Sequence, residues 1–262
     1  MKVSPKLLLP LSLLLPLSFC FAQSASEPRH APDGGTIERF ASITIPSMPN
    51  APFTATVNTK WVRELPDGSY ITLVNHRTIA RDGQGRIYQQ RAFFVPPDGD
   101  HKSIPYQIEV SDPVTHSVYV CRTAQKICRL LGFHPVLSKE SRTAAPLPVG
   151  ANAPGFTAES LGTQVVSGLE TVGTRESRVV QAATIGNEAP ILERKEFWYS
   201  AQLGINMITR REDPRFSTQQ DFEVSDVALG EPDAALFAVP TGFKIIDLRN
   251  PPEVAAPASS PD

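Results

Sequence analysis

The sequence predicts a mainly β fold, built as one strongly curved antiparallel sheet with few short helices. Apolar and polar residues alternate with period two, most clearly over residues 104–111, as they do in a strand with one wet face. Short clusters of Pro, Asp, Asn and Gly separate such stretches, and these clusters are typical of turns between antiparallel strands. Only residues 231–237 carry the signals of a helix start.

The first expected strands form an antiparallel meander. A Pro-Asp-Gly turn separates residues 53–65 from residues 69–81. The Asp-Gly-Gln-Gly turn at 82–85 separates the second strand from residues 86–95, because glycine adopts the positive φ that tight hairpins need. Three more strands are then expected, at residues 104–111, Ser117–Arg122 and 126–131.

A stretch rich in Pro, Ala and Gly at about 133–157 is expected to be a long surface loop. This loop could mark a domain boundary. However, the strands on either side are too long and one-sided for each half to fold comfortably alone, so we expect one antiparallel β domain over residues 52–248 rather than two small domains. The strands expected after the loop are residues 161–167, 170–181, Ile191–Ser200, 205–211 and 216–228.

The end of this domain carries the single helical turn. Glu231, Pro232 and Asp233 place acidic residues and a proline at a helix start. The turn is too short to pack in a bundle, and apolar residues that should return the chain to the sheet follow it: Val239, Phe243, Ile245 and Ile246.

Residues 1–22 have the three parts of a secretory signal peptide: positive charge at Lys2 and Lys6, an apolar run over 7–21, and a small residue at Ala22. We expect cleavage after Ala22 and a mature protein in the periplasm or secreted. A membrane anchor is the weaker interpretation. The apolar run is about 15 residues long and contains two prolines, whereas a spanning helix needs roughly 20 unbroken apolar residues.

The flanks of the mature chain are proline-rich. Residues 23–51 are expected to be a flexible leader and residues 249–262 a disordered tail, since such compositions bury too little apolar surface to offset the entropy of ordering. No transmembrane segment is expected in the mature chain. Lipid attachment at Cys20 is disfavoured, because the bulky Phe19 stands where a lipoprotein signal has a small residue.

Charge excludes one class of partner. The formal net charge is −2, with acidic and basic residues interspersed rather than in blocks. Such a chain has no electrostatic footprint for a nucleic-acid backbone or an anionic membrane. We therefore expect no nucleic-acid partner.

The two cysteines of the mature chain, Cys121 and Cys128, are expected to form a structural disulfide, as thiols of exported proteins do. If residues 123–126 form the hairpin turn, the two cysteines lie directly opposite each other and can be bonded. A metal site with His116 and His134 and a redox pair are the alternatives. Both fit less well, because six residues separate these cysteines, whereas zinc cysteines and redox motifs have closer spacings.

The sequence predicts no catalytic, cofactor-binding or metal-binding residue. Asp82 is alone in its glycine-rich turn, whereas a calcium loop needs several oxygen ligands. Glu193, Glu196 and Glu212 alternate with basic residues, as on an exposed strand face where opposite charges pair across the ladder. No protease, phosphate-loop or nucleophile-elbow pattern includes any of the five histidines: His30, His76, His101, His116 and His134.

Aromatic residues fall on the expected strands. Adjacent pairs, Phe93-Phe94 and Phe197-Trp198, should point to opposite faces, because side chains alternate along a strand. Both faces of the sheet are therefore expected to carry apolar patches. A sheet of this kind is covered on both sides or carries a groove.

Several short motifs together resemble the ending of periplasmic lipoprotein-carrier-like domains. They are Phe197-Trp198-Tyr199 with Leu203-Gly204, then Glu231-Pro232-Asp233, Leu236-Phe237, Val239-Pro240 and Gly242-Phe243. The chain also resembles uncharacterised exported bacterial proteins with Ile185-Gly186-Asn187, Trp198-Tyr199-Ser200 and Asp213-Pro214-Arg215-Phe216 in this order. The resemblance implies a half-open β-barrel whose concave apolar face holds acyl chains or a partner's lipid group. The amphipathic helices that open such carriers and cap their cavity are not evident.

The leading functional expectation is a non-enzymatic exported envelope protein. It would bind an apolar ligand or a lipidated partner on the concave face of a curved sheet, with a lipid, a lipoprotein or another envelope protein as partner and without a cofactor. The alternative is a periplasmic protein-interaction or sensory module without a small-molecule ligand. An exposed apolar groove favours the first, and a filled interior favours the second.

Overall fold

The structure, a computed structural model, describes residues 43–133 and 154–249. The expected signal peptide with its cleavage site and most of the expected leader lie outside the described residues. So do the central part of the expected loop and the tail from residue 250 onward.

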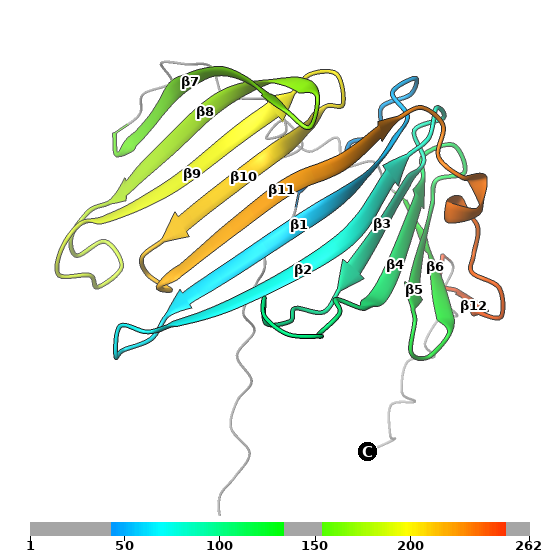
Figure 1. The fold of residues 1–262 in the computed structure, drawn as a ribbon, viewed down its shortest axis with the longest axis horizontal. Helices are drawn as coiled ribbons and strands as arrows, with labels where there is room; N and C mark the ends of the chain where they lie inside the picture. The colour runs from blue at the N-terminus through cyan, green and yellow to red at the C-terminus, as the bar shows by residue number, and fades with distance from the viewer. Residues whose placement is uncertain (1–42, 134–153, 250–262) are drawn as a thin grey trace, which may run out of the picture. The chain divides into compact units, whose positions relative to one another are not determined.

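Within the described residues, twelve strands form one sheet (Figure 1). The order across the sheet is β12-β6-β5-β4-β3-β2-β1-β11-β10-β9-β8-β7. This confirms the mainly β fold and the single continuous sheet. The strands are β1 (Phe53–Glu64), β2 (Tyr70–Arg81), β3 (Ile87–Ala92), β4 (Pro105–Asp112), β5 (Ser117–Arg122), β6 (Ile127–Gly132), β7 (Phe156–Val166), β8 (Leu169–Val180), β9 (Ile191–Ser200), β10 (Ile205–Asp213), β11 (Thr218–Leu229) and β12 (Lys244–Asp247), with the 3-10 helix η2 (Ala234–Phe237) before β12.

The pairing of β1 with β11 makes one sheet out of two meanders. β1 pairs with β2 along one side and with β11 along the other, from Phe53 opposite Leu229 to Arg63 opposite Thr218. The edge strand of each meander, β1 in the first and β11 in the second, is therefore paired with the other meander. This is the physical reason why the long loop of the sequence does not separate two sheets.

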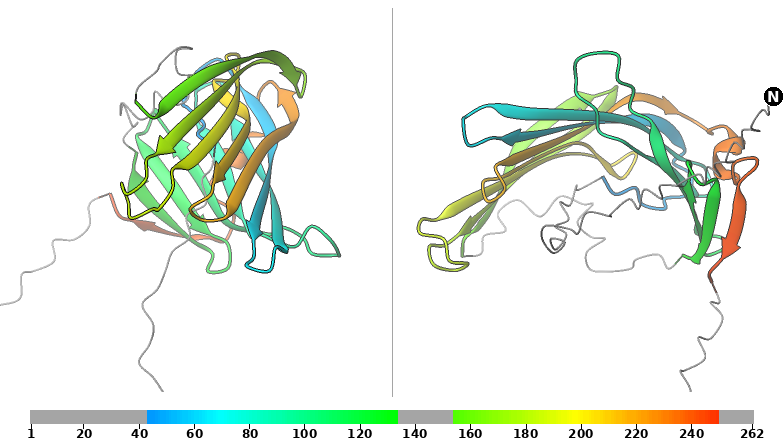
Figure 2. Two further views of the ribbon diagram at one scale, coloured as in Figure 1. Left: turned by 90° about the vertical axis from the view of Figure 1, so that its left-hand side faces the viewer. Right: turned by 90° about the horizontal axis from the view of Figure 1, so that it is seen from below.

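The sheet is curved, and the segment before β1 lies on its concave side (Figure 2). We call this segment, residues 43–52, the strap. The sequence placed its first nine residues in a flexible leader, but Ile43 and Ile45 of the strap are buried. They belong to the main core cluster, together with Phe53, Val57, Ile79, Ile87, Ile205, Met207, Phe222 and Val224.

Arg81, a fully buried residue of β2, fastens the strap to the sheet. Its Nε and Nη2 donate to the carbonyl oxygen of Ala51 at 2.9 and 2.8 Å, and Nη1 donates to that of Pro46 at 3.1 Å. Burial lowers the pKa of Arg81 to about 10, so that the guanidinium is still charged at neutral pH. Backbone carbonyls of the strap thus satisfy a buried cation.

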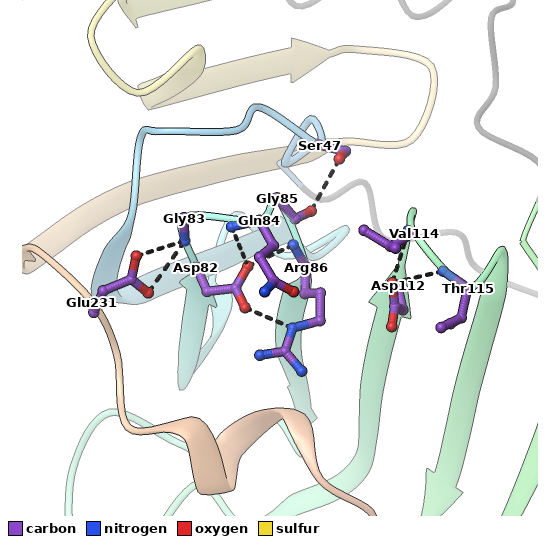
Figure 3. Close-up of polar contacts among 10 residues, drawn as sticks. All are labelled: Ser47, Asp82, Gly83, Gln84, Gly85, Arg86, Asp112, Val114, Thr115 and Glu231. Atoms are coloured by element: carbon purple, nitrogen blue, oxygen red, sulfur yellow. Dashed lines mark hydrogen bonds and ion pairs between the residues drawn. The ribbon is translucent and has the colours of Figure 1, made fainter.

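The β2–β3 turn is held from two sides (Figure 3). The carboxylate of Asp82 accepts from the backbone nitrogens of Gln84 and Arg86 at 3.1 and 2.8 Å, and from Arg86 Nε at 2.6 Å. Glu231 accepts from the Gly83 nitrogen with both oxygens, at 3.0 and 3.2 Å. A Cβ at Gly83 would collide with this carboxylate. The carboxylates of Asp82 and Glu231 thus stabilise the backbone of the 82–85 turn that the sequence predicted.

The opposite, convex face carries a smaller core under η2. Phe237 of η2 packs in a cluster with Ala80 of β2, Tyr88 of β3 and Val110 of β4. Asp233 caps this turn, since its carboxylate accepts from the backbone nitrogen of Ala235 at 2.9 Å. Both faces therefore carry apolar residues, as the sequence indicated.

Three details differ from the sequence-based expectation. β12 pairs with β6 in parallel rather than antiparallel, because the segment between β11 and β12 runs along the sheet before the chain re-enters it. β7 begins at Phe156, inside the range expected for the loop. Phe216 is 61% exposed in the β10–β11 turn, whereas its spacing from Phe222 indicated a half-buried strand position.

Candidate functional site

Two large hollows open on the sheet, one on each face. The first, of about 740 Å³, lies over β7 to β10 on the convex face. The second, of about 620 Å³, lies over β1 to β5 on the concave face, with Phe222 of β11 in its wall. Their charged side chains distinguish them: ion pairs join those of the first, whereas Arg91 and Arg122 of the second have no ion pair with a carboxylate among the described residues.

The larger, convex hollow is lined by charges that neutralise one another. This is the charge pairing across strands that the sequence predicted for Glu196 and Glu212. Little is left to attract a ligand. The ion pairs are Arg175–Glu159 at 2.9 Å, Arg175–Glu196 at 3.2 Å, Arg210–Glu196 at 2.5 Å and Arg194–Glu212 at 3.7 Å.

Glu193 departs from that prediction. It lies an odd number of residues from Glu196 on β9 and therefore points to the opposite face. Glu193 is only 8% exposed, and its carboxylate lies 2.7 Å from Nη2 of Arg215. The solvated strand face expected for all three glutamates is therefore wrong for this one.

The concave hollow is built from side chains that register brings to one face. Thr59 of β1 lies opposite Asn75 of β2, and Gln107 of β4 lies opposite both Arg91 of β3 and Arg122 of β5. Residues paired in register point to the same side of a sheet. Five neighbouring strands thus contribute to one wall.

Aromatic rings form the apolar part of this hollow. Phe93 packs on Tyr106 with ring centroids 4.8 Å apart, and the guanidinium of Arg122 lies 5.8 Å from the Tyr106 centroid. Phe93 and Phe94 both line the hollow, although adjacent residues of a regular strand point to opposite faces. The reason is local: β3 ends at Ala92, and strict alternation ends with it.

The polar part of the hollow is cationic. Arg77, Arg91 and Arg122 line it, and no aspartate or glutamate is among the described residues of its lining. Burial lowers the pKa of Arg77 to about 10, and the positive charge of Arg91 acts in the same direction. Tyr106 and Glu109 act in the opposite direction with smaller effects. At neutral pH the hollow therefore holds three positive charges on one face.

The two cysteines and the described histidines are not part of the lining of this hollow. Cys121 lies opposite Cys128 in the β5–β6 hairpin, and their sulfur atoms are bonded at 2.00 Å. His76 is exposed on β2, where Nδ1 lies 2.6 Å from Oδ1 of Asn58. His101 lies in the β3–β4 loop and His116 in the β4–β5 turn, while His30 and His134 lie outside the described residues.

The described residues include neither a metal-ligand cluster nor a membrane-spanning helix. In the ranges 43–133 and 154–249, no group of three or more His, Cys, Asp or Glu side chains could hold a metal ion. In the same ranges, no helix has the length and hydropathy needed to cross a bilayer.

The sequence reasoning missed the arginine group. A signal was present, since Asn75 and Arg77 stand two residues apart on one strand and therefore share a face. Arg91 and Arg122 join them only through the registers of β3, β4 and β5.

Comparisons with known proteins add fold likeness alone. No protein-family model and no curated protein matches the chain. A solved structure from Thermus thermophilus, an uncharacterised conserved protein, is 10% identical and covers 75% of this chain and 90% of that chain, with a TM-score of 0.39. A LolA superfamily protein from Nitrosomonas europaea is 10% identical over 73% of this chain and 91% of its own, with a TM-score of 0.31.

A third similar structure is the MucA/MucB complex of Pseudomonas aeruginosa, at 12% identity and a TM-score of 0.39 over 74% of this chain. The match covers 58% of that chain, which is less than two thirds of its length. Similar structures thus include the lipoprotein-carrier class that the sequence resembles. At these TM-scores the likeness transfers no ligand, partner or activity.

Proposed function

We propose that this chain is an exported, non-enzymatic binding protein of the periplasm or cell envelope. It binds an apolar ligand, or the lipid group of a partner, in the hollow on the concave face of its sheet. The signal-peptide pattern of residues 1–22 supports export.

The observation that carries this proposal is the concave hollow itself. Its volume of about 620 Å³ lies within the range of about 300–1,000 Å³ that is usual for small-molecule sites. Phe93 and Tyr106 present two aromatic rings in contact, tilted by 43°, to it, and Phe93 is 58% exposed. An exposed aromatic wall inside a concavity is typical of a surface that a ligand covers.

One observation favours the second candidate, a protein-interaction module. The strap already covers the most apolar part of the concave face with Ile43 and Ile45. Part of the interior is therefore filled by the chain itself, and an interaction module needs no ligand there. A bound apolar ligand separates the two candidates.

The test is native mass spectrometry of the purified mature protein before and after mild organic extraction. We expect a mass excess that extraction removes, and we expect Phe93→Ser to lose it. Phe216→Ser is the matched control, since Phe216 is similarly exposed, at 61% against 58%, but lies in the β10–β11 turn outside the hollow. A wild-type protein with the clean apo mass would favour the interaction module.

A further inference from the structure

We propose that the concave hollow recognises an anionic group, a phosphate or a carboxylate, at the head of an amphipathic ligand. Arg91 and Arg122 bind the anion, with Arg77 behind them, and Phe93 and Tyr106 contact the adjoining apolar part. This deepens the proposed function and rests on it for the apolar half of the ligand.

The first support is the charge balance of the hollow. Three guanidinium groups from β2, β3 and β5 line it, and the described part of its lining includes no acidic side chain. Among the described residues, neither Arg91 nor Arg122 has an ion pair with a carboxylate. On the convex face, by contrast, Arg175 has carboxylates at 2.9 and 3.2 Å. The described residues thus pair the cations of the convex hollow, whereas Arg91 and Arg122 of the concave hollow have no carboxylate partner among them.

The second support is the electrostatic repulsion between Arg77 and Arg91. Arg77 is 5% exposed, and among the neighbouring charges Arg91 has the largest effect on its pKa, an unfavourable one. Glu109, the carboxylate acting on Arg77, accepts a hydrogen bond from Gln89 Nε2 at 2.9 Å. Like charges held together on a partly buried surface are stabilised by an anion placed between them.

The third support is an unused acceptor in the same wall. Asn75 is 6% exposed; its Nδ2 donates to the carbonyl oxygen of Ala92 at 3.3 Å, while its buried Oδ1 has no hydrogen-bond partner among the described residues. A buried carbonyl without a donor costs free energy. A hydroxyl or N–H group on the ligand, next to its anionic group, would satisfy it.

The aromatic side chains indicate that the part of the ligand next to its anionic group is apolar. The Phe93 and Tyr106 rings lie in contact, and Arg122 lies over the Tyr106 ring at 5.8 Å. Cation and apolar surface therefore adjoin in one site. An amphipath satisfies both, because its charge meets the arginines while its chain covers the rings.

The test compares three probes by isothermal titration calorimetry with the mature chain: decyl phosphate, uncharged decyl maltoside and inorganic phosphate. We expect decyl phosphate to bind most tightly, and the double variant Arg91→Gln/Arg122→Gln to weaken it by about tenfold or more. Binding of decyl maltoside should change little in this variant. Arg194→Gln on the convex face is the control and should leave both affinities unchanged. Circular dichroism checks that each variant is folded.

The outcomes separate this proposal from the proposed function. Equal affinities for decyl phosphate and decyl maltoside, or an unchanged affinity in the double variant, would overturn the anionic head group and leave the apolar site standing. Inorganic phosphate binding as tightly as decyl phosphate would show an anion site without an apolar half, which contradicts the amphipath and the proposed function. Binding of no probe would overturn both.

Discussion

At the scale of single residues, burial and the positive charge of Arg91 both lower the pKa of Arg77. A buried cation costs free energy when nothing compensates it, and this lowers the pKa of Arg77 to about 10. A pKa of about 10 still leaves the side chain charged through the neutral range. The hollow therefore keeps the positive charge of Arg77 through the neutral pH range.

We predict that affinity for a permanently charged probe, decanesulfonate, is flat from about pH 6 to 9 and falls above about pH 10. Because the folded apo-protein loses a proton from Arg77 near pH 10, each further pH unit should weaken a bond that needs this charge by up to about tenfold. Fluorescence titration of the mature chain measures this. A loss of affinity between pH 6 and 8 would indicate a histidine in the site and contradict the assignment to arginines.

At the scale of elements, the disulfide closes a short hairpin. Cys121 and Cys128 are seven positions apart and face each other in the β5–β6 ladder. β5 also supplies Arg122 to the hollow, directly after Cys121. The bond therefore fixes the strand that carries one wall of the site, although it lies outside the site itself.

We predict that Cys121→Ser/Cys128→Ser is less stable than the wild type by at most about 2–3 kcal/mol, because the closed loop is short. Urea unfolding measures the difference. The intact mass should lie two hydrogens below the fully reduced value, a difference of about 2 Da for one disulfide. Reaction of both thiols with an alkylating reagent in the native protein would contradict the bond.

The strands also show which parts of the fold can be predicted from the sequence alone. Alternation and turn chemistry placed the strands and the β5–β6 register, since both depend on neighbours in the chain. The parallel entry of β12 and the common position of Phe93 and Phe94 were not predictable in this way. They depend on where a connecting segment runs and on where a strand ends. The group of Arg77, Arg91 and Arg122 was not predicted for the same reason. The registers of the β2–β3, β3–β4 and β4–β5 pairs together place these residues on one face.

At the scale of the whole molecule, the β1–β11 ladder decides whether the described sheet unfolds as one unit. Phe222 lies opposite Thr59 of β1 and Thr209 of β10, and it is 3% exposed in the main core. The same core contains residues of both meanders and of the strap. Because both meanders contribute to one core, we expect their unfolding to be coupled.

The two tryptophans of the chain report on the two halves separately, since Trp61 is on β1 and Trp198 on β9. We predict that Trp61→Phe and Trp198→Phe, each followed by fluorescence of the remaining tryptophan and by circular dichroism in urea, give coincident transitions within each variant. Phe222→Ala, added to either variant, should lower both midpoints together, with a cost of about 3–5 kcal/mol for an emptied aromatic position. If the Trp198 signal changes at a different urea concentration from the Trp61 signal in backgrounds of matched stability, the halves are separate folding units. The β1–β11 ladder would then be a docking interface between two domains, and a ligand on the β1–β5 side would protect only that half.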